Sequence, residues 1–265
     1  RITNATDTSF SITYTTEENI VGSVNFGRDK NLGQNALDER DQSTNNISPH
    51  KIHSITINNL KPSTAYFFSI ISGQNTFLNN EEPFRVLTGA VIQATPSSQM
   101  PITGNVILPD GNKPTEAIVY VVVDRAQTIS TPVKSDGSYI LPLNSLRANN
   151  LSSYFNFDND SIIKMLIATN SLKSNVLLSK EQVSPIPTIT LSKDYDFTIS
   201  PEPVASASAQ QSSELFSTIS AQPASSSKSP QILTPKDNEG FTDQQPLFKG
   251  NALPNQTVKI IINSS

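Results

Sequence analysis

The chain has 265 residues but no cysteine and no tryptophan, and it has only two histidines and two methionines. Without cysteine it can form neither a disulfide framework nor a zinc–thiolate centre, and it has no cysteine nucleophile. The lack of cysteine also disfavours a disulfide-stapled animal secreted protein. An exported bacterial surface protein, in contrast, can do without cysteine and so avoid mispairing.

Positive charge is scarce and scattered. The chain carries 19 lysines and arginines against 23 aspartates and glutamates, which gives a formal net charge of −4. No block of basic residues occurs anywhere in the sequence, and a nucleic-acid-binding surface needs clustered cationic side chains. We therefore expect no nucleic-acid partner.

Long hydrophobic runs are missing as well. The longest, Ile118–Val123, is far shorter than the roughly 18–20 apolar residues of a membrane-spanning helix, so we expect no membrane span in this chain. The sequence opens at Arg1 and stops at Ser265 inside strand-like patterns. We interpret it as an excerpt of a longer protein, in which the lack of a signal or anchor carries no information.

The sequence does contain many short alternating segments separated by polar turns. Hydrophobic residues make up 35% of the chain, and proline is more frequent than glycine, at 18 against 10. This composition fits small antiparallel sandwiches, with one solvated face per sheet, better than a large buried parallel sheet. One sandwich module has about 100 residues, so the length predicts two or three units. The expected fold class is all-β, with antiparallel β-sandwiches in tandem.

The first predicted sandwich covers residues 1–90. The polar stretch 31–49 predicts a long loop or a ragged edge, and no segment has helical periodicity. The corner Leu60–Tyr66 predicts a tyrosine corner, in which the Tyr66 hydroxyl bonds to backbone a few residues upstream. Alternating apolar residues predict strands at Phe10–Tyr14, Val24–Phe26, His53–Ile57, Tyr66–Ile70 and Phe84–Thr88.

This first block resembles a fibronectin type III domain. The resembling residues are Asp7–Thr16, the pattern Gly22-x-Val24-x-Phe26-Gly27, the Leu60–Tyr66 corner and the closing strand Phe84–Thr88. The family usually has Trp where Tyr14 stands in this chain. The style of the block looks like the versions that precede metallophosphoesterases such as purple acid phosphatases, whose catalytic domain is not in this chain.

The second predicted sandwich covers residues 98–198. The run Ala117–Val123 is apolar on both faces, which predicts a central strand. The segment Ser135-Asp136-Gly137-Ser138 predicts a hairpin, because Asp-Gly supplies the positive φ of a tight turn. Further strands are predicted at 102–108, 139–143, 162–168 and 189–191. The order of these signals is similar to carboxypeptidase-regulatory-like or transthyretin-like domains, which are small prealbumin-type sandwiches.

The last part of the chain changes character. Residues 200–229 are rich in Pro, Ser, Ala and Gln and predict a disordered linker, because they have too little apolar surface to offset the entropy of ordering. Residues 230–265 resemble the first third of a bacterial Ig-like repeat. Strands are expected there at Pro230–Pro235, Pro246–Gly250 and Val258–Ile262.

No residue is predicted to be catalytic, to bind a cofactor or to ligate a metal. His50 and His53 would point to opposite faces of their strand, and we interpret them as surface or half-buried side chains. The charged residues Glu17, Glu18 and 39–41 are interpreted as solvated. There is no Gly-x-Ser-x-Gly elbow, no carboxylate pair indicating glycoside hydrolysis and no glycine-rich phosphate loop.

Two clusters leave an alternative open. The segment Asp158-Asn159-Asp160-Ser161 is rich in oxygen, but an EF-type calcium loop needs further ligands and a bidentate Glu. A solvated turn is therefore the favoured interpretation. Tyr154, Phe155 and Phe157 would form a platform for stacking on a sugar if they were exposed, although such aromatic clusters more often belong to a core.

These observations predict a non-catalytic scaffold, stalk or adhesion segment of a bacterial secreted or cell-surface protein. Its partners would be other proteins or surface glycans, and it would need no cofactor. Two alternatives stay open. The modules would be accessory domains of an extracellular hydrolase whose catalytic domain lies outside this chain, or they would form a carbohydrate-binding module.

Overall fold

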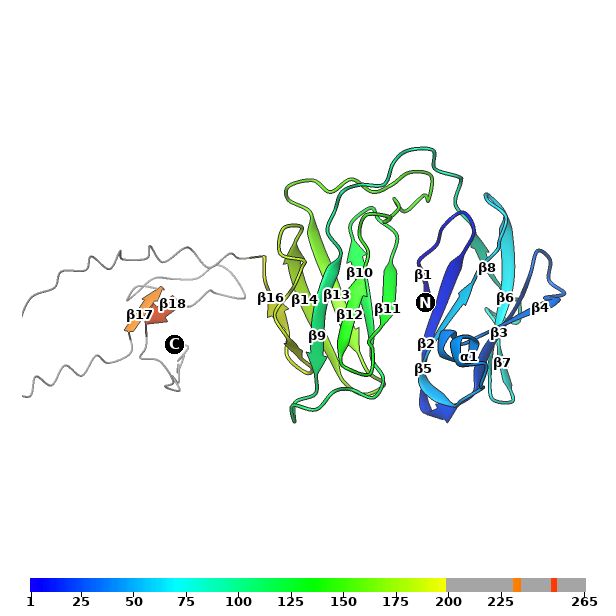
Figure 1. The fold of residues 1–265 in the computed structure, drawn as a ribbon, viewed down its shortest axis with the longest axis horizontal. Coiled ribbons are helices and arrows are strands. Elements are labelled where there is room, and N and C mark those ends of the chain that lie inside the picture. Colours follow the sequence, from blue (N-terminus) through cyan, green and yellow to red (C-terminus); the bar gives the residue numbers. More distant parts are fainter. Residues whose placement is uncertain (199–230, 235–248, 252–265) are drawn as a thin grey trace, which may run out of the picture. The chain divides into compact units, whose positions relative to one another are not determined.

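The computed structural model describes residues 1–198, 231–234 and 249–251. The fold is all-β, as predicted, and residues 1–198 form two sandwiches in succession (Figure 1). Both sandwiches belong to one compact unit. In the described part of the chain no helix is long and apolar enough to cross a membrane.

The first sandwich consists of two antiparallel sheets and one short helix. One sheet has the strand order β1-β2-β5, and the other has the order β4-β3-β6-β7, with β8 also paired to β6. The elements are β1 (Ile2–Thr3), β2 (Phe10–Ile20), β3 (Gly22–Gly27), β4 (Gln34–Leu37), α1 (Glu39–Thr44), β5 (His50–Ile57), β6 (Ala65–Ser72), β7 (Asn75–Phe77) and β8 (Phe84–Leu87).

The second sandwich also has two sheets, but each contains one parallel pair. The larger sheet has the order β11-β10-β13-β14-β16 with β14 and β16 parallel, and the smaller has the order β12-β9-β15 with β9 and β15 parallel. The strands are β9 (Ile102–Ile107), β10 (Ile118–Val123), β11 (Ile129–Pro132), β12 (Ser138–Leu141), β13 (Ile162–Ala168), β14 (Lys173–Ser179), β15 (Ile189–Thr190) and β16 (Tyr195–Asp196).

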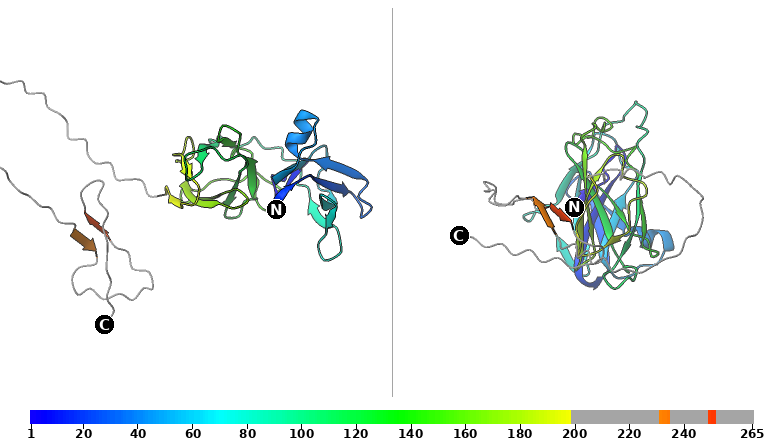
Figure 2. Two further views of the ribbon diagram at one scale, coloured as in Figure 1. Left: turned by 90° about the horizontal axis from the view of Figure 1, so that it is seen from below. Right: turned by 90° about the vertical axis from the view of Figure 1, so that its left-hand side faces the viewer.

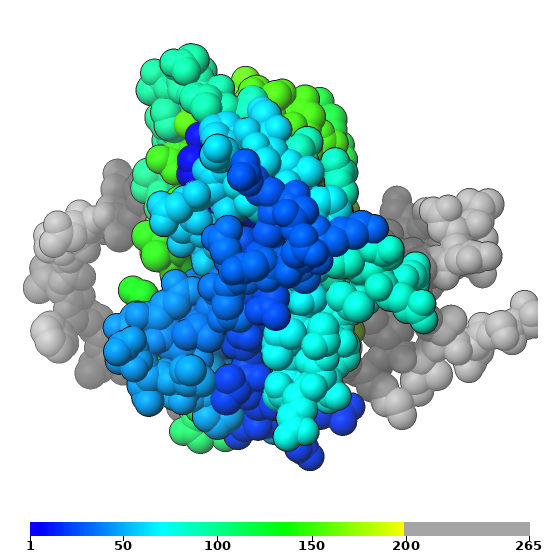
Figure 3. Space-filling view, turned by 90° about the vertical axis from the view of Figure 1, so that its right-hand side faces the viewer, coloured from blue at the N-terminus to red at the C-terminus, as the bar shows by residue number. Residues whose placement is uncertain are grey.

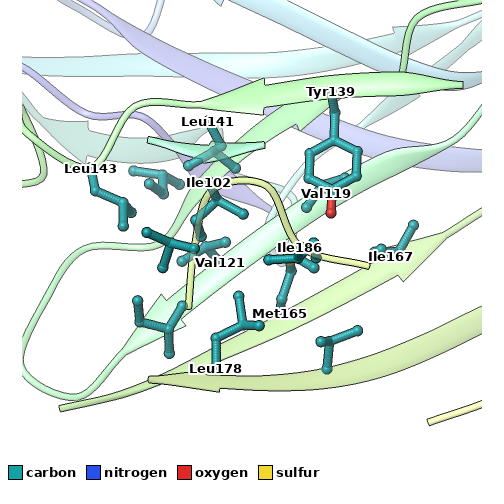
Figure 4. Close-up of a cluster of buried hydrophobic side chains, with 14 of the residues drawn as sticks. Ile102, Val119, Val121, Tyr139, Leu141, Leu143, Met165, Ile167, Leu178 and Ile186 are labelled. Atoms are coloured by element: carbon teal, nitrogen blue, oxygen red, sulfur yellow. The ribbon is translucent and has the colours of Figure 1, made fainter. Parts of the chain in front are cut away.

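Each sandwich encloses an apolar core of its own. Twenty buried side chains fill the second core, and Figure 4 shows part of this cluster between the two sheets. Strand alternation produces it: Ile163, Met165 and Ile167 of β13 point inward, whereas Lys164 is exposed. The first core is smaller, with eleven buried side chains that include Phe10.

The predicted tyrosine corner is confirmed. Tyr66 lies in the core of the first sandwich, and its hydroxyl accepts a hydrogen bond from the backbone N–H of Lys61 at 3.0 Å. Ser63, inside the corner, has a positive φ of 49°. The corner therefore fixes the entry of β6 into the core.

The second sandwich contains a corner with the same spacing, which the sequence analysis missed. The backbone N–H of Thr190 donates to the Tyr195 hydroxyl at 3.0 Å, and Ser192 has a positive φ of 71°. In both corners a donor five residues before the tyrosine reaches its hydroxyl, and a serine three residues before it takes the left-handed conformation. This second corner leads into β16.

Two local predictions are only partly right. Gly137 has a φ of 81° and donates to the Lys134 carbonyl oxygen at 2.8 Å, and the Lys134 N–H donates to the Ser138 carbonyl oxygen at 2.9 Å, so the predicted tight turn is closed as in a hairpin. The strand β11 before it pairs with β10, whereas β12 after it pairs with β9, so the turn links the two sheets. The polar stretch 31–49 contains the edge strand β4 and also the helix α1, which lacks the length to show periodicity.

The C-terminal predictions are covered only in part. The linker 200–229 lies outside the described residues. Within the Ig-like stretch 230–265, β17 (Gln231–Thr234) and β18 (Lys249–Asn251) pair antiparallel and overlap the first two predicted strands. The third predicted strand, Val258–Ile262, lies outside the described residues.

Candidate functional site

Several polar side chains with three or more hydrogen bonds each lie where the two sandwiches meet, and we call this region the junction. The sheet that contains β10 and β11 faces the sheet that contains β1 and β2 (Figures 1 and 2). Seen from its far end, the first sandwich lies in front of the second (Figure 3). The junction residues are Thr3, Asn4, Asp7, Thr13, Arg40, His50, Lys51, Ile52 and Ala90 on one side, and Glu116, Ile118, Tyr120, Thr128, Ser130, Arg147 and Leu166 on the other.

The apolar centre of the junction explains the pattern of β10. Val119 and Val121 lie in the core of the second sandwich, whereas Ile118 and Tyr120 point the opposite way and pack with Ile52 of the first. All five side chains are at most 6% exposed. The prediction that β10 is a central strand is confirmed, because β11 and β13 flank it. The outer face of β10 is apolar for a different reason, because it packs against the first sandwich.

On one side of this centre, Asn4 caps the edge of β11. Its side-chain nitrogen donates to the Ser130 carbonyl oxygen at 3.0 Å, and its side-chain oxygen accepts from the Ser130 N–H at 2.9 Å. The Thr3 and Ser130 hydroxyls are 2.7 Å apart, and the Tyr120 hydroxyl donates to that of Thr13 at 3.0 Å. An edge strand leaves backbone groups unpaired, and here the first sandwich pairs them.

On the other side, Glu116 of the second sandwich caps the edge of β5 in the first. Its Oε2 accepts the backbone N–H groups of Lys51 at 2.8 Å and Ile52 at 3.1 Å. Its Oε1 accepts from Arg40 at 2.8 Å and lies 2.9 Å from Nδ1 of His50. Each sandwich therefore caps an edge strand of the other.

Helix α1 holds Arg40 at this edge. Asp38 is its N-cap residue, and the Asp38 carboxylate accepts the backbone N–H of Arg40 at 3.1 Å, the Arg40 Nε at 2.8 Å and the Ser54 N–H at 3.0 Å. Arg40 also donates to the Ile52 carbonyl oxygen. The prediction of solvated charges is therefore wrong for Asp41, which is 2% exposed and accepts the backbone N–H of Ser48 at 3.0 Å. It is only partly right for Arg40, whose half-exposed side chain is held by Asp38 and by the edge of β5.

The carboxylates of Asp38, which caps helix α1, and of Glu116, which caps the edge of β5, both favour the ionised state. Burial of Asp38 opposes ionisation, but its hydrogen bonds from Arg40 and from backbone outweigh this effect and hold the pKa of Asp38 below its usual value. Burial likewise opposes ionisation of Glu116, and the two backbone N–H groups of β5 together with Arg40 lower its pKa overall. Hydrogen bonds to the charged form thus prevail over desolvation at both sites.

A further attachment involves Arg147, which is 5% exposed. Its guanidinium donates to the Asp7 carboxylate at 2.6 Å, to the Ala90 carbonyl at 2.8 Å and to the Leu151 carbonyl at 3.1 Å. Ala90 belongs to the connector between β8 and β9. Arg147 therefore ties the first sandwich, the connector and the second sandwich to one another.

His53 is completely buried, and is neither at the surface nor half-buried as predicted. Its ring stacks on that of Tyr14 with the centroids 4.4 Å apart, and neither ring nitrogen has a hydrogen-bond partner among the described residues. Burial lowers the pKa of His53. Gly22 makes this packing possible, because a Cβ there would lie 2.1 Å from the Tyr14 hydroxyl and 2.4 Å from Nδ1 of His53.

Two surface grooves lie near these features. One, of about 620 Å³, runs between α1 and the segment after β11 and is lined by Glu39, Arg40 and Lys134 among others. The other, of about 590 Å³, is lined by residues that include Arg125 and Asp158. Both contain charged side chains from several segments, and neither contains a pair of residues arranged as nucleophile and base.

The remaining sequence candidates are placed as follows. The Asp158–Ser161 turn is solvated as predicted, and Asp158 pairs with Arg125 at 3.1 Å. Phe155 is 6% exposed within the second core and Phe157 packs against that core, so these rings do not form a sugar-stacking platform. Glu17 and Glu18 are exposed, as predicted.

The contacts of the junction attach the two sandwiches to each other. Within residues 1–198 and the two short described strands, no cluster of three or more His, Asp or Glu side chains is placed to hold a metal ion. A scan against models of known protein families finds no match, and a search of curated proteins finds none either.

Proposed function

We propose that residues 1–198 act as a rigid, non-catalytic two-sandwich spacer in a bacterial protein that is secreted or held at the cell surface. The observation that carries this proposal is the junction, in which each sandwich caps an edge strand of the other through Asn4 and Glu116. Such a unit would hold a neighbouring element at a set distance and in a set direction.

The distribution of the contacts supports rigidity. Asn4, Glu116 and Arg147 attach the sandwiches through separate sets of hydrogen bonds, and Ile118 and Tyr120 supply an apolar centre. Relative motion between linked domains is the usual expectation unless their interface is large and apolar or otherwise firmly held. Attachments that are spread across an interface resist both bending and twisting, whereas a single contact would act as a hinge.

The sequence resemblances support the cellular setting. Residues 1–90 resemble a fibronectin type III domain, and 98–198 resemble a carboxypeptidase-regulatory-like domain. Modules of these kinds serve as spacers and adhesion scaffolds in bacterial surface proteins, where their loops contact other proteins or surface glycans. The cysteine-free composition suits an exported protein of this type.

Residual dipolar couplings measured on the whole chain at about pH 6 would test the proposal. We expect one alignment tensor to fit the amide couplings of both sandwiches. The double variant Asn4→Ala with Glu116→Ala is expected to require two tensors, while Glu181→Ala, an exposed acidic control in the second sandwich, is expected to keep one. If the unaltered chain itself required two tensors, the spacer proposal would fail.

A further inference from the structure

His50 lies between two carboxylates that come from different sandwiches. Its Nδ1 is 2.9 Å from Oε1 of Glu116 in the second sandwich, and its Nε2 is 3.4 Å from Oδ1 of Asp41 in the first. An ionised carboxylate only accepts hydrogen bonds, and a neutral imidazole has a single N–H. The neutral ring can therefore donate to one of these partners, whereas the imidazolium can donate to both.

We propose that His50 is a proton-operated latch of the junction, which holds the two sandwiches together more firmly when its ring is protonated. The inference rests on the proposed rigid spacer and adds regulation to the same site. The ligand is a proton that binds to the His50 ring, and the carboxylates of Asp41 and Glu116 accept the hydrogen bonds of the protonated ring.

The charges around His50 favour such a latch. Three carboxylates face one guanidinium in this cluster, so an added proton on His50 reduces an excess of negative charge. Arg40 opposes protonation because it already donates to Glu116. Ile20, the register partner of His50 on β2, carries no charge. Asp41 and Glu116 contact His50 directly, and Arg40 reaches it through Glu116. The other titratable or charged groups of this cluster are Asp38, which holds Arg40, and Lys51 and His53 on β5 itself.

Asp41 gives the latch its anchor in the first sandwich. This carboxylate is 2% exposed, and its Oδ1 also accepts the backbone N–H of Ser48 at 3.0 Å. Its Oδ2 has no hydrogen-bond partner among the described residues. A charged donor such as the imidazolium stabilises a buried carboxylate that can still accept a hydrogen bond more than it stabilises an exposed carboxylate.

The direction of the effect follows from these contacts. Histidine is the side chain whose charge changes between about pH 5 and pH 8. Towards the acidic end the charged ring donates to Glu116 across the junction and to Asp41 within its own sandwich. Towards the alkaline end the neutral ring keeps a single N–H and loses the charge that strengthens the bond to Glu116. The junction therefore loosens as the pH rises through this range.

The absence of cysteine makes a direct measurement practical. Thr76→Cys and Lys193→Cys introduce one exposed labelling site in each sandwich, and single-molecule energy transfer then reports the distance between them. We expect the population outside the main distance peak to rise about tenfold from about pH 5.5 to about pH 8, the change expected for one charge-assisted hydrogen bond. His50→Gln, which cannot titrate, is expected to give the same distribution at both pH values.

Three results would overturn the latch. A narrow, pH-independent distribution in the parent chain would refute the latch and leave the rigid spacer intact, whereas a broad distribution at both pH values would refute both. A pH response retained in His50→Gln would assign it to another group. Asp41→Asn serves as the second variant, since loss of this anchor charge is expected to flatten the same response, and circular dichroism at both pH values verifies that each variant is folded.

Discussion

The two sandwiches fill their interiors in different ways. Within residues 1–198, the first sandwich buries ten polar or charged side chains and the second buries three. The apolar clusters run the other way, with eleven buried residues in the first core and twenty in the second. The second sandwich is thus held mainly by dry packing, whereas the first depends more on hydrogen bonds, on charges and on its neighbour.

Arg147 is the exception in the second sandwich, because it is buried and charged, and it provides the largest expected effect. Arg147→Met is predicted to destabilise the protein by about 3 kcal/mol, since it leaves Asp7 and two carbonyl oxygens without their donor. Arg125→Met is the control, because Arg125 makes only exposed ion pairs, and it is expected to cost less than about 0.5 kcal/mol. If chemical denaturation showed equal losses in the free energy of unfolding for the two variants, Arg147 would not tie the two sandwiches together.

The polar interior of the first sandwich is also tightly packed around Gly22. Gly22→Ala would place a Cβ 2.1 Å from the Tyr14 hydroxyl and 2.4 Å from a ring nitrogen of His53. We expect a loss of about 2 kcal/mol through overpacking. Gly33→Ala is the matched control, because nothing lies within 4 Å of its Cβ. Thermal unfolding that showed no difference between the two variants would contradict the stacked arrangement.

The two tyrosine corners allow the stability of the two sandwiches to be compared at the same motif. Tyr66→Phe is expected to destabilise the protein by roughly 1–2 kcal/mol, because the Lys61 N–H would lose its partner next to a buried ring. Tyr195 is only partly buried, on the short edge strand β16, so Tyr195→Phe is expected to cost about half as much. Denaturation of both variants measures the ratio, and a larger loss at Tyr195 would reverse the ranking.

The sequence predicted the parts of the fold that depend on local pattern. Alternating residues indicated most strands, and the Pro-containing heptad indicated the Tyr66 corner. The corner at Tyr195 has no proline and joins two-residue strands, so it gave no comparable signal. The strand β14 was missed even though the buried residues Ser174, Val176 and Leu178 alternate with exposed or half-buried positions. The helix α1 has the acidic first turn and Asp N-cap of a helix start, but it is too short for periodicity.

The junction could not be predicted in the same way. Glu116 and Arg40 are 76 positions apart, and only the packing of two separate sandwiches brings them together. The capping of β5 depends on which strand remains at a sheet edge, which is a property of the topology. One signal was available: β10 is apolar on both faces, and the residues Ile118 and Tyr120 on its outer face need a partner. Such a strand indicates a covered sheet without identifying what covers it.

The smallest predicted effect is a change of stability with pH. It distinguishes the two sandwiches because only the first contains histidine. Both histidines belong to the first sandwich. Burial lowers the pKa of His53 in the folded state from its usual value of 6.5. The unfolded chain therefore takes up this proton first as the pH falls, so the contribution is fully present above pH 6.5 and is lost progressively below it.

In a His50→Gln background, which removes the other histidine, we expect the free energy of unfolding to fall by up to about 0.7 kcal/mol between pH 7 and pH 6. His53→Leu in the same background should remove the contribution of this ring, whatever the absolute stability of the variant. The amino terminus, whose pKa burial lowers from 8.0, titrates in both variants, so its contribution cancels when the two profiles are subtracted. Denaturation at a series of pH values measures both slopes. If the slope persisted without His53, the buried ring would not be its source, and the two interiors would respond alike to pH.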